Sequence, residues 1–310
     1  MSNLIDAAVL VDALADPNRE PIIDARSPGE FSRGHIPGAI SVPLFDDAER
    51  AEIGTMYKQL GRNPAISRGL EIAESKADQL IESVRRVAPR AEVIVHCWRG
   101  GMRSGGFAWL LEQSGFQPRV LTGGYKAFRR TARLGLAEPR RVIILGGHTG
   151  AGKTQVLAAL RKAGEQVIDL EGLAGHRGSA FGGIGRAPQP TVEQFENELF
   201  LQWRDLLPNK TVWIEGESKA IGRVYIPDPV WNQMLIAPAV FVEVDRAKRV
   251  EFLVAEYGEL PTDQLAAAVS KIKKRLGGDR LTAALAALEQ RDLSTFAAIT
   301  LEYYDLSLIH

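Results

Sequence analysis

A single cysteine, Cys97, lies in a sequence context that favours a reactive thiolate. It ends the β-branched run 93–97, and the glycine-rich turn Arg99-Gly100-Gly101-Met102-Arg103 follows it before a helical pattern begins. The N–H groups of such a turn, the positive end of the helix and the arginine cations would all stabilise a thiolate. We therefore expect a thiol pKa lowered from about 8.5 into the range of roughly 3.5–7.5. A buried structural cysteine is the alternative, but arginines and glycines on its flank favour an anion-binding loop supported by Arg99, Gly100, Gly101 and Arg103.

A second pattern predicts a phosphate-binding loop. The residues Gly147-His148-Thr149-Gly150-Ala151-Gly152-Lys153-Thr154 match G-x-x-x-x-G-K-[ST], between a predicted strand at 141–145 and a helical pattern. Gly147, Gly150 and Gly152 would let backbone N–H groups wrap a diphosphate. Lys153 would bring a positive charge to the outer phosphates, and Thr154 would offer its hydroxyl to a magnesium ion. The pattern predicts a bound polyphosphate and does not indicate whether it is hydrolysed.

Two further groups of residues could assist an anion or a cation. His176 and Arg177 lie in the glycine-rich segment Gly172–Gly183, which is typical either of a mobile loop that grips an anion or of a plain flexible loop. Glu215 and Glu217 follow a predicted strand at 211–215, where an acid could join the shell of a magnesium ion. Acids at strand ends are also common as helix caps, so both interpretations stay open.

Basic residues gather at two places. The segment 129–141 contains Arg129, Arg130, Arg133, Arg140 and Arg141, with Glu138 as its only acid. It is interpreted either as a solvated helix end and linker or as a stripe that contacts phosphates at a domain boundary. A second cluster near one predicted helix end could complement the helix dipole or contact RNA; it comprises Lys271, Lys273, Lys274 and Arg275.

Alternating strands and helices must position these residues, and they predict two α/β domains. In the first, we expect strands at 21–26, 93–97 and 119–121, helices at 4–14, 70–87 and 103–114, and a capping box at Ser27–Glu30. In the second, we expect strands at 141–145, 166–170, 211–215 and 239–244, with a helical C-terminal region. Such alternation favours mostly parallel sheets covered on both faces, in domains spanning 1–137 and 138–310.

Length and composition limit the class of protein. The 310 residues suffice for two domains, and 45% hydrophobic with 25% charged residues is usual for a soluble globular protein. No apolar run approaches the ~20 residues of a membrane span and no signal peptide is recognised, so we expect a cytoplasmic protein without a membrane partner. The lone cysteine excludes an internal disulfide or resolving thiol and fits a reducing compartment. Lys+Arg and Asp+Glu both total 38, so overall charge does not indicate a nucleic-acid partner.

The motifs of the first half resemble those of rhodanese-type domains. They occur in order as Asp24–Phe31, Gly34–Ala39, the Cys97 loop and Leu121–Gly124. Such a domain placed before a P-loop domain resembles the bacterial tRNA 2-selenouridine synthase family across nearly the whole chain, as do Gly54–Gln59, His176–Gly182 and Glu215–Gly222. One departure is that family members usually continue past the equivalent of Tyr303-Tyr304-Asp305, whereas this sequence closes with Leu306–His310.

The resemblance implies a tRNA-modifying transferase with a rhodanese-like domain and a P-loop NTPase-like domain. Its expected reaction replaces the sulfur of wobble 5-methylaminomethyl-2-thiouridine by selenium from selenophosphate, through an S-geranyl intermediate made from geranyl diphosphate. Cys97 matches the residue that carries selenium as S-selanylcysteine, and the loop 147–154 would hold the diphosphate of a nucleotide or of the geranyl donor.

The same resemblance implies tRNA and a selenophosphate-supplying enzyme as partners. No firmly bound cofactor or metal is implied, although a nucleotide or magnesium ion could accompany the P-loop. The segment 129–141 is the first expectation for the tRNA-binding surface, and the surroundings of Tyr57, Lys58 and Arg62 are the second.

Other functions stay open at this point. Cys97 to Arg103 form C-x5-R, one residue longer than a typical sulfur-handling rhodanese loop, which can ring a phosphate-sized anion such as selenophosphate. The same pattern is that of cysteine phosphatases, although residues 98–102 contain no acid to protonate a leaving oxygen. Two further alternatives are a persulfide sulfurtransferase with a regulatory nucleotide domain and a non-catalytic tRNA- or nucleotide-binding module. The thiol disfavours the last, since binding alone requires no cysteine.

Overall fold

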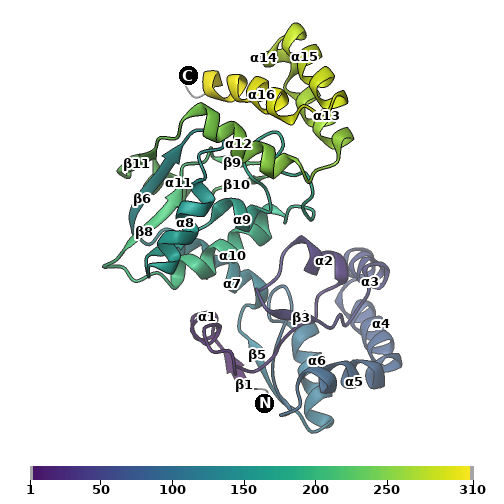
Figure 1. The fold of residues 1–310 in the computed structure, drawn as a ribbon. Coiled ribbons are helices and arrows are strands. Elements are labelled where there is room, and N and C mark those ends of the chain that lie inside the picture. The colour runs from purple at the N-terminus through teal and green to yellow at the C-terminus, as the bar shows by residue number, and fades with distance from the viewer. Residues whose placement is uncertain (1–2, 308–310) are drawn as a thin grey trace. The chain divides into compact units, whose positions relative to one another are not determined.

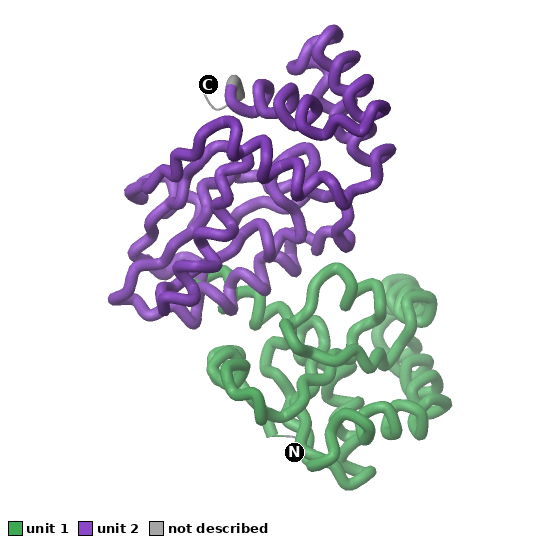
Figure 2. The backbone as a smooth tube through the Cα atoms, viewed as in Figure 1, with its two compact units in different colours: residues 1–135 green, residues 136–310 purple. Residues whose placement is uncertain are grey.

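The computed structural model describes residues 3–307 and divides into two compact units, shown in Figures 1 and 2. Unit 1 is Met1–Gly135 and unit 2 is Leu136–His310, a division beside the domain boundary expected at 137/138. The last three residues, 308–310, belong to the C-terminal segment that differs from the family pattern, and they lie outside the part of the chain that the structure describes. Across residues 3–307, no helix is both long and apolar enough to cross a membrane.

Unit 1 is built on a five-stranded parallel sheet in the order β1-β5-β4-β2-β3. Because β4 is the middle strand, its carboxyl end, which leads into Cys97, is flanked by the ends of β2 and β5. The strands are β1 (Asn3–Ile5), β2 (Ile22–Asp24), β3 (Ala39–Ser41), β4 (Glu92–His96) and β5 (Gln117–Leu121). The helices are α1 (Ala7–Ala13), α2 (Pro28–Arg33), α3 (Asp47–Gln59), α4 (Arg62–Ser75), α5 (Ala77–Val87), α6 (Met102–Gln113) and α7 (Gly124–Gly135).

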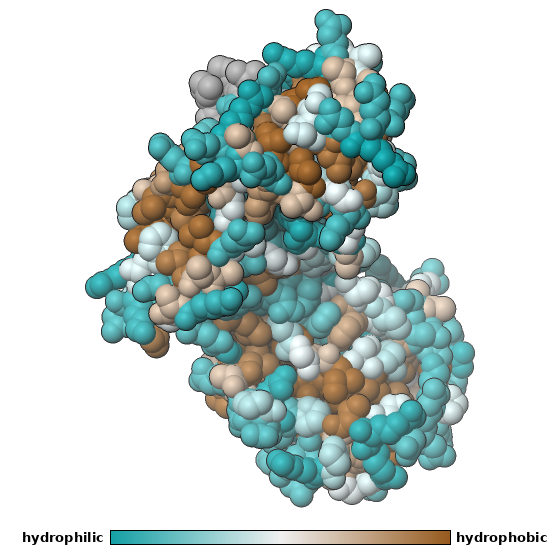
Figure 3. Space-filling model, in the orientation of Figure 1, coloured by the Kyte–Doolittle hydropathy of each residue, from teal (hydrophilic) through white to brown (hydrophobic). Residues whose placement is uncertain are grey.

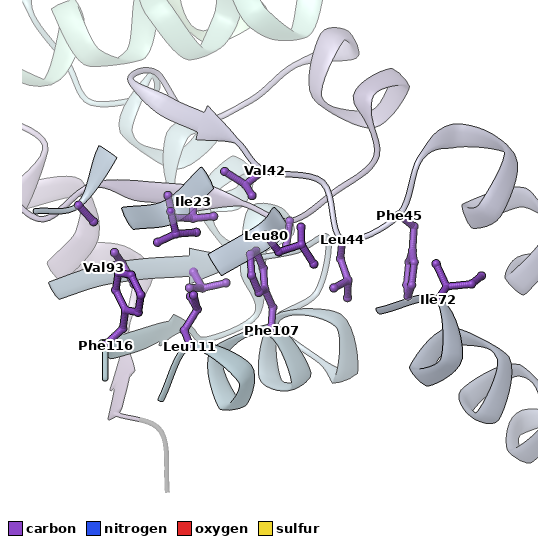
Figure 4. Close-up of a cluster of buried hydrophobic side chains, with 14 residues drawn as sticks. Ile23, Val42, Leu44, Phe45, Ile72, Leu80, Val93, Phe107, Leu111 and Phe116 are labelled. Carbon is purple, nitrogen blue, oxygen red and sulfur yellow. The ribbon is translucent and has the colours of Figure 1, made fainter. Parts of the chain in front are cut away.

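Apolar side chains cover both faces of this sheet. Ile23 of β2 and Val93 of β4 belong to a buried cluster with Phe107 and Leu111 of α6, as Figure 4 shows. Ile22 and Ile94, the neighbours that point to the opposite face, are equally buried. The pattern confirms the expected α/β layering, in which a parallel sheet is covered on both sides.

Two elements of unit 1 differ from the sequence expectation. The pattern predicts a helix over 4–14, but residues 3–5 form β1 and α1 begins at Ala7. Pairing with the edge of β5 explains the difference. Successive residues of a strand point to opposite sides, so Ile5 is buried while Leu4 is exposed. The expected helix 70–87 is two helices, since Lys76 leaves the helical conformation between α4 and α5 (φ −112°, ψ 1°) and pairs with Glu49 of α3.

Unit 2 contains a parallel four-stranded sheet in the order β11-β6-β8-β7 and a small antiparallel pair, β9 with β10. Its strands are β6 (Arg141–Gly147), β7 (Gln166–Ile168), β8 (Thr211–Glu215), β9 (Ala220–Ile221), β10 (Val224–Tyr225) and β11 (Ala239–Val242). Its helices are α8 (Lys153–Lys162), α9 (Leu170–Ala174), α10 (Val192–Arg204), α11 (Asp228–Ile236), α12 (Arg246–Tyr257), α13 (Thr262–Lys271), α14 (Lys273–Leu276), α15 (Gly278–Glu289) and α16 (Leu293–Ser307). Strand β7 ends before the expected residue 170 because Asp169 accepts a hydrogen bond from the Gly172 N–H (2.6 Å) and caps α9.

The predicted helical C-terminal region is confirmed, and it has its own core. Leu253 of α12, Val269 of α13 and Phe296 of α16 pack around Phe181, which comes from the glycine-rich segment 172–183. The rings of Phe181 and Phe296 meet edge to face with centroids 5.8 Å apart, and the Ala180 N–H donates to the Tyr304 hydroxyl (3.0 Å). These contacts anchor this part of the glycine-rich segment to the helices.

Candidate active site

The turn that follows β5 fixes the Cys97 loop at the carboxyl end of β4. The N–H of Tyr125 donates to the Cys97 carbonyl (2.9 Å), and the N–H of Lys126 donates to the Trp98 carbonyl (3.0 Å). Glycine is required at position 124, since a Cβ there would lie 2.3 Å from the Cys97 carbonyl oxygen. Gly124, which ends the motif Leu121–Gly124, and the first turn of α7 therefore support the loop.

The thiol of Cys97 is 4% exposed and is surrounded by hydrogen-bond donors. Its Sγ lies 3.3 Å from Ser104 Oγ, and the backbone N–H groups of Arg99, Gly101 and Ser104 also bond to it. Burial raises the pKa of a thiol, but these hydrogen bonds outweigh burial and hold the pKa of Cys97 below its usual value. The donors come from the loop and the first turn of α6, and they favour the thiolate, as expected from the sequence.

The two arginines of the loop have different surroundings. Arg103 makes a two-point salt bridge with Glu30 of α2, with N–O distances of 2.7 and 3.3 Å. Burial lowers the pKa of Arg103, but Glu30 and the nearby charge of Cys97 raise it above its usual value. Arg103 is thus a fixed cation near the thiolate, whereas Arg99 is exposed to solvent.

Glu30 serves both the predicted capping box of α2 and Arg103. It accepts a hydrogen bond from the Ser27 N–H (3.2 Å) in addition to those from Arg103. Burial raises the pKa of Glu30, but Arg103, the Ser27 N–H and Arg50 together hold it below its usual value. A carboxyl that stays ionised cannot protonate a leaving oxygen, so Glu30 does not provide the general acid that a phosphatase would need.

A buried ionic network joins the other rhodanese-like motifs to the strand that carries Cys97. Arg26 donates to Asp24 (2.6 Å between Nη2 and Oδ2) and to the Gly34 carbonyl (2.8 Å), and its guanidinium lies 3.9 Å above the Tyr125 ring. His96 Nε2 lies 3.6 Å from Asp24 Oδ2. Burial lowers the pKa of His96, and this fully buried ring lies beside the network.

In unit 2, residues 147–154 connect β6 to α8. Gly152 adopts a left-handed conformation (φ 73°), which favours glycine. Lys153 Nζ donates to the Gly147 carbonyl (3.2 Å), and the Thr154 side chain is exposed. The C-terminal helices brace the loop, since Arg249 of α12 donates to the Thr149 carbonyl (3.3 Å) and forms two 2.8 Å bonds to Asp305 of α16.

Three glutamates gather near Lys153. Glu171 joins the predicted pair Glu215 and Glu217: its N–H donates to Glu215 (2.6 Å), and its carboxyl is hydrogen-bonded to Glu217. Burial and neighbouring acids raise the pKa of Glu215 to about 8. Burial also raises the pKa values of Glu171 and Glu217, and the charge of Lys153 opposes that rise.

The prediction did not include Glu171. It follows the end of β7, and β7 pairs with β8 in the sheet, so the carboxyl ends of both strands deliver acids to one edge. In the described part of the chain, no group of three or more His, Cys, Asp or Glu has the arrangement of a metal site. A magnesium role for Glu215 and Glu217 therefore stays a prediction.

The structure does not give His176 and Arg177 a shared role. Arg177 forms an ion pair with Glu256 of α12. His176 lines a cavity of about 570 Å³ with Arg186, Arg223 and Lys271. The pKa of His176 is lowered mainly by burial and further by the charges of Arg186 and Lys271. The cations suit an anion, but they come from separate segments, so no sequence pattern marks them as one group.

The basic segment 129–141 is not one continuous exposed stripe. Arg129 is buried (7% exposed) in α7. Arg140 Nε donates to the Trp203 carbonyl (3.4 Å), and Arg141 Nη1 donates to the Asn209 carbonyl (3.3 Å), both within unit 2. Arg130, Arg133 and Arg141 are exposed, so three of the five arginines that the phosphate-contacting interpretation used remain at the surface.

Comparison with known proteins gives two family matches and many relatives. Residues 6–131 match rhodanese-like domains, and residues 140–304 match the tRNA 2-selenouridine synthase AAA domain. Proteins named tRNA 2-selenouridine synthase are similar over most of this chain. They include those of Nitrosomonas europaea (36% identical, 76% of this chain, 63% of the relative), Hahella chejuensis (37%, 88%, 79%) and Marinobacter nauticus (34%, 93%, 87%). The chain thus spans less than two thirds of the Nitrosomonas relative and more than three quarters of the other two.

The hydrogen bond from Ser104 generates a prediction about the thiol. Ser104→Ala should raise the pKa of Cys97 by about one pH unit, since it removes one bond to a charged group. The ultraviolet absorbance of the thiolate, followed against pH, measures this directly because the chain has a single cysteine. Ser114→Ala, at the other end of the same helix, is the control. A wild-type midpoint at or above about 8.5 would contradict the account.

The buried carboxyls predict a pH-dependent stability. Folding raises the pKa of Glu215 from 4.5 to about 8, so the folded state binds more protons in that window and loses stability as the pH rises through it. Glu215→Gln keeps an oxygen that can accept from the Glu171 N–H and should reduce this loss by on the order of 2 kcal/mol. Calorimetric unfolding at pH 5 and pH 8 measures it, with the exposed Glu289→Gln as control. If wild type and Glu215→Gln lose the same stability between pH 5 and pH 8, Glu215 does not carry a proton in the folded state at the lower pH.

Proposed function

Since the chain belongs to the tRNA 2-selenouridine synthase family, we propose that it replaces sulfur by selenium in a 2-thiouridine of tRNA. The observation that carries the proposal is the set of contacts at the Cys97 sulfur, which bonds to backbone N–H groups and to Ser104 beside a fixed arginine. The proposed substrate is wobble 5-methylaminomethyl-2-thiouridine, and the proposed donors are selenophosphate and geranyl diphosphate.

The Cys97 loop is the proposed site of selenium transfer. Its N–H groups and the exposed Arg99 suit the phosphate part of selenophosphate, while Arg103 keeps positive charge near the sulfur. The Cys97 thiolate then attacks the selenium of selenophosphate: the S–Se bond of S-selanylcysteine forms, the Se–P bond breaks, and its electron pair leaves on phosphorus, which is reduced to phosphite. An enzyme that makes selenophosphate would be the partner that supplies this donor.

The P-loop is the proposed site of geranylation. There the sulfur of 2-thiouridine attacks C1 of geranyl diphosphate, a C–S bond forms as the C–O bond breaks, and diphosphate leaves with the electron pair. Backbone N–H groups of 147–154 and Lys153 would hold that diphosphate. The carboxyls of Glu215 and Glu217, whose pKa values burial raises, would lose their protons to hold a magnesium ion with Thr154, which would neutralise diphosphate charge.

Geranylation gives a chemical reason for two sites in one chain. A sulfur bonded only to C2 of the base would have to leave as sulfide, whereas a geranylated sulfur leaves as a thiolate, which is a better leaving group. The outer selenium of S-selanylcysteine then attacks C2 as the C2–S bond breaks and geranylthiolate departs with the electron pair. A small-molecule thiol next attacks the Cys97 sulfur, so that the S–Se bond breaks, selenium stays on C2, and a disulfide between Cys97 and that thiol is left for a second thiol to reduce. The order of reactions is therefore geranylation first and selenium transfer second.

Loss of the thiol should separate these two reactions. With thiolated tRNA, selenophosphate and geranyl diphosphate, Cys97→Ser should accumulate S-geranyl uridine and form no selenouridine, because unit 2 is unchanged. Nucleoside mass spectrometry of the digested tRNA measures both products. Selenouridine formed by Cys97→Ser at the wild-type rate would refute the role of the thiol. Neither product with the wild type would refute the proposed function.

Removal of the P-loop cation should stop the first reaction. Lys153→Ala should lower the rate of S-geranyl uridine formation by about 10²-fold, since it removes the cation that we propose stabilises the departing diphosphate. The same variant should still convert chemically prepared S-geranyl tRNA to selenouridine. Lys162→Ala, at the opposite end of α8, is the matched control. Geranylation by Lys153→Ala at the wild-type rate would place the diphosphate elsewhere.

A further inference from the structure

An apolar cavity of about 650 Å³ lies in unit 1 among α3, α4 and α6, and the proposed function gives it no role. Leu44 and Phe45, which Figure 4 shows within the buried cluster of unit 1, line it together with Ile53 of α3 and Leu110 of α6. Among its lining side chains, only Glu74 and Arg103 carry a charge. The volume falls in the range of about 300–1,000 Å³ typical of small-molecule sites.

The walls of this cavity hold apolar surface that the fold leaves in contact with water. Tyr57, Leu70, Met102 and Trp109 all line it, and each is more than half exposed. Single exposed hydrophobic residues are ordinary, but several around one hollow mark a binding site. Figure 3 shows apolar residues on the visible face of unit 1.

One end of the cavity reaches the thiol loop. Met102 and Arg103 line the cavity and form the first turn of α6, whose next residue, Ser104, donates to the sulfur of Cys97. The salt bridge to Glu30 fixes the Arg103 guanidinium there. A hydrocarbon chain in the cavity would therefore have its polar end at Arg103, in the neighbourhood of the reactive sulfur.

Charges of both signs lie at the edge of the cavity: the exposed Glu74 lines it, and two cations lie beside its lining residues. Lys58 is exposed next to Tyr57, and the exposed Arg62 lies with Nη2 3.9 Å from the sulfur of Met102. An apolar hollow with lysine and arginine at its edge complements a hydrocarbon chain attached to a polyanion. This combination favours a lipid-like group carried by RNA over a free hydrocarbon or an apolar protein surface.

Glycine keeps the cavity open. Gly106 lies inside α6 and lines the cavity, and a Cβ built on it would meet no atom within 4 Å. Glycine inside a helix costs about 1 kcal/mol relative to alanine, so its position here has a cost that room for a ligand would explain. Gly105, its neighbour, has equally open space but does not line the cavity.

We propose that this cavity binds the geranyl chain of the S-geranyl-tRNA intermediate during selenium transfer. The inference rests on the proposed function, which supplies a ten-carbon branched chain on the sulfur that must leave. With the chain in the cavity and the RNA backbone at Lys58 and Arg62, the C2–S bond of the base would lie at the Arg103 end. The cavity thus assigns unit 1 its own recognition site for the intermediate, separate from the diphosphate site of unit 2.

The full chain tests this with two anticodon stem-loop RNAs, one carrying S-geranyl-2-thiouridine and one carrying S-methyl-2-thiouridine. Wild type should bind the geranyl RNA at least about tenfold more tightly. Gly106→Leu should remove that preference and leave the S-methyl RNA within about twofold of wild type. Gly105→Leu is the matched control and should keep the preference. If Gly106→Leu does not fold, Trp109→Ala, which removes an exposed wall, should reduce the same preference.

Three results would overturn the inference: no geranyl preference in wild type, an unchanged preference in Gly106→Leu, or a dimer that Gly106→Leu converts to monomer. The last would show that a second copy of the chain occupies the cavity. Binding separates this inference from the proposed function. If the wild type prefers the geranyl RNA but makes no selenouridine, the proposed reaction is refuted and the proposed geranyl site stands. If the wild type makes selenouridine and Gly106→Leu keeps the geranyl preference, the proposed site is refuted and the proposed reaction stands.

Discussion

The Cys97 loop depends on hydrogen bonds that favour the thiolate form of a sulfur that is almost completely buried. Burial alone favours the neutral thiol, so the loop must supply donors to reverse the effect. Ser104 and three backbone N–H groups do this only if the loop keeps one conformation. Gly124 permits the close support from the turn after β5, and Glu30 holds Arg103, so distant motifs serve one sulfur atom.

The two candidate sites have different electrostatic surroundings. Around Cys97, hydrogen-bond donors and the Arg103 cation surround the sulfur, which suits an anionic nucleophile and an incoming anion. Near the P-loop, the half-buried Glu171 and Glu217 lie near Lys153 and beside the buried Glu215, and burial raises the pKa of all three carboxyls. A cation would favour the ionised carboxylates, whereas a bare diphosphate would oppose their ionisation. This contrast supports selenium chemistry in unit 1 and diphosphate chemistry with a cation in unit 2.

Features set by contiguous residues could be predicted from the sequence, and features set by packing could not. The Cys97 loop, the capping box of α2 and the P-loop are local patterns, and the structure contains each of them. Strand β1 was expected as a helix because its partner, β5, is more than a hundred residues away. Glu171 could be linked to Glu215 only by knowing that β7 pairs with β8. The apolar cavity likewise depends on how α3, α4 and α6 pack.

The central claim is that the Cys97 sulfur itself accepts selenium. Intact-protein mass spectrometry of the full chain after incubation with selenophosphate, without added reductant, tests it most directly. The account predicts the addition of one selenium atom, located at Cys97 by peptide mapping and absent from Cys97→Ser. A phosphate group on Cys97 without selenium would contradict it, because the thiolate would then attack phosphorus, as in a cysteine phosphatase.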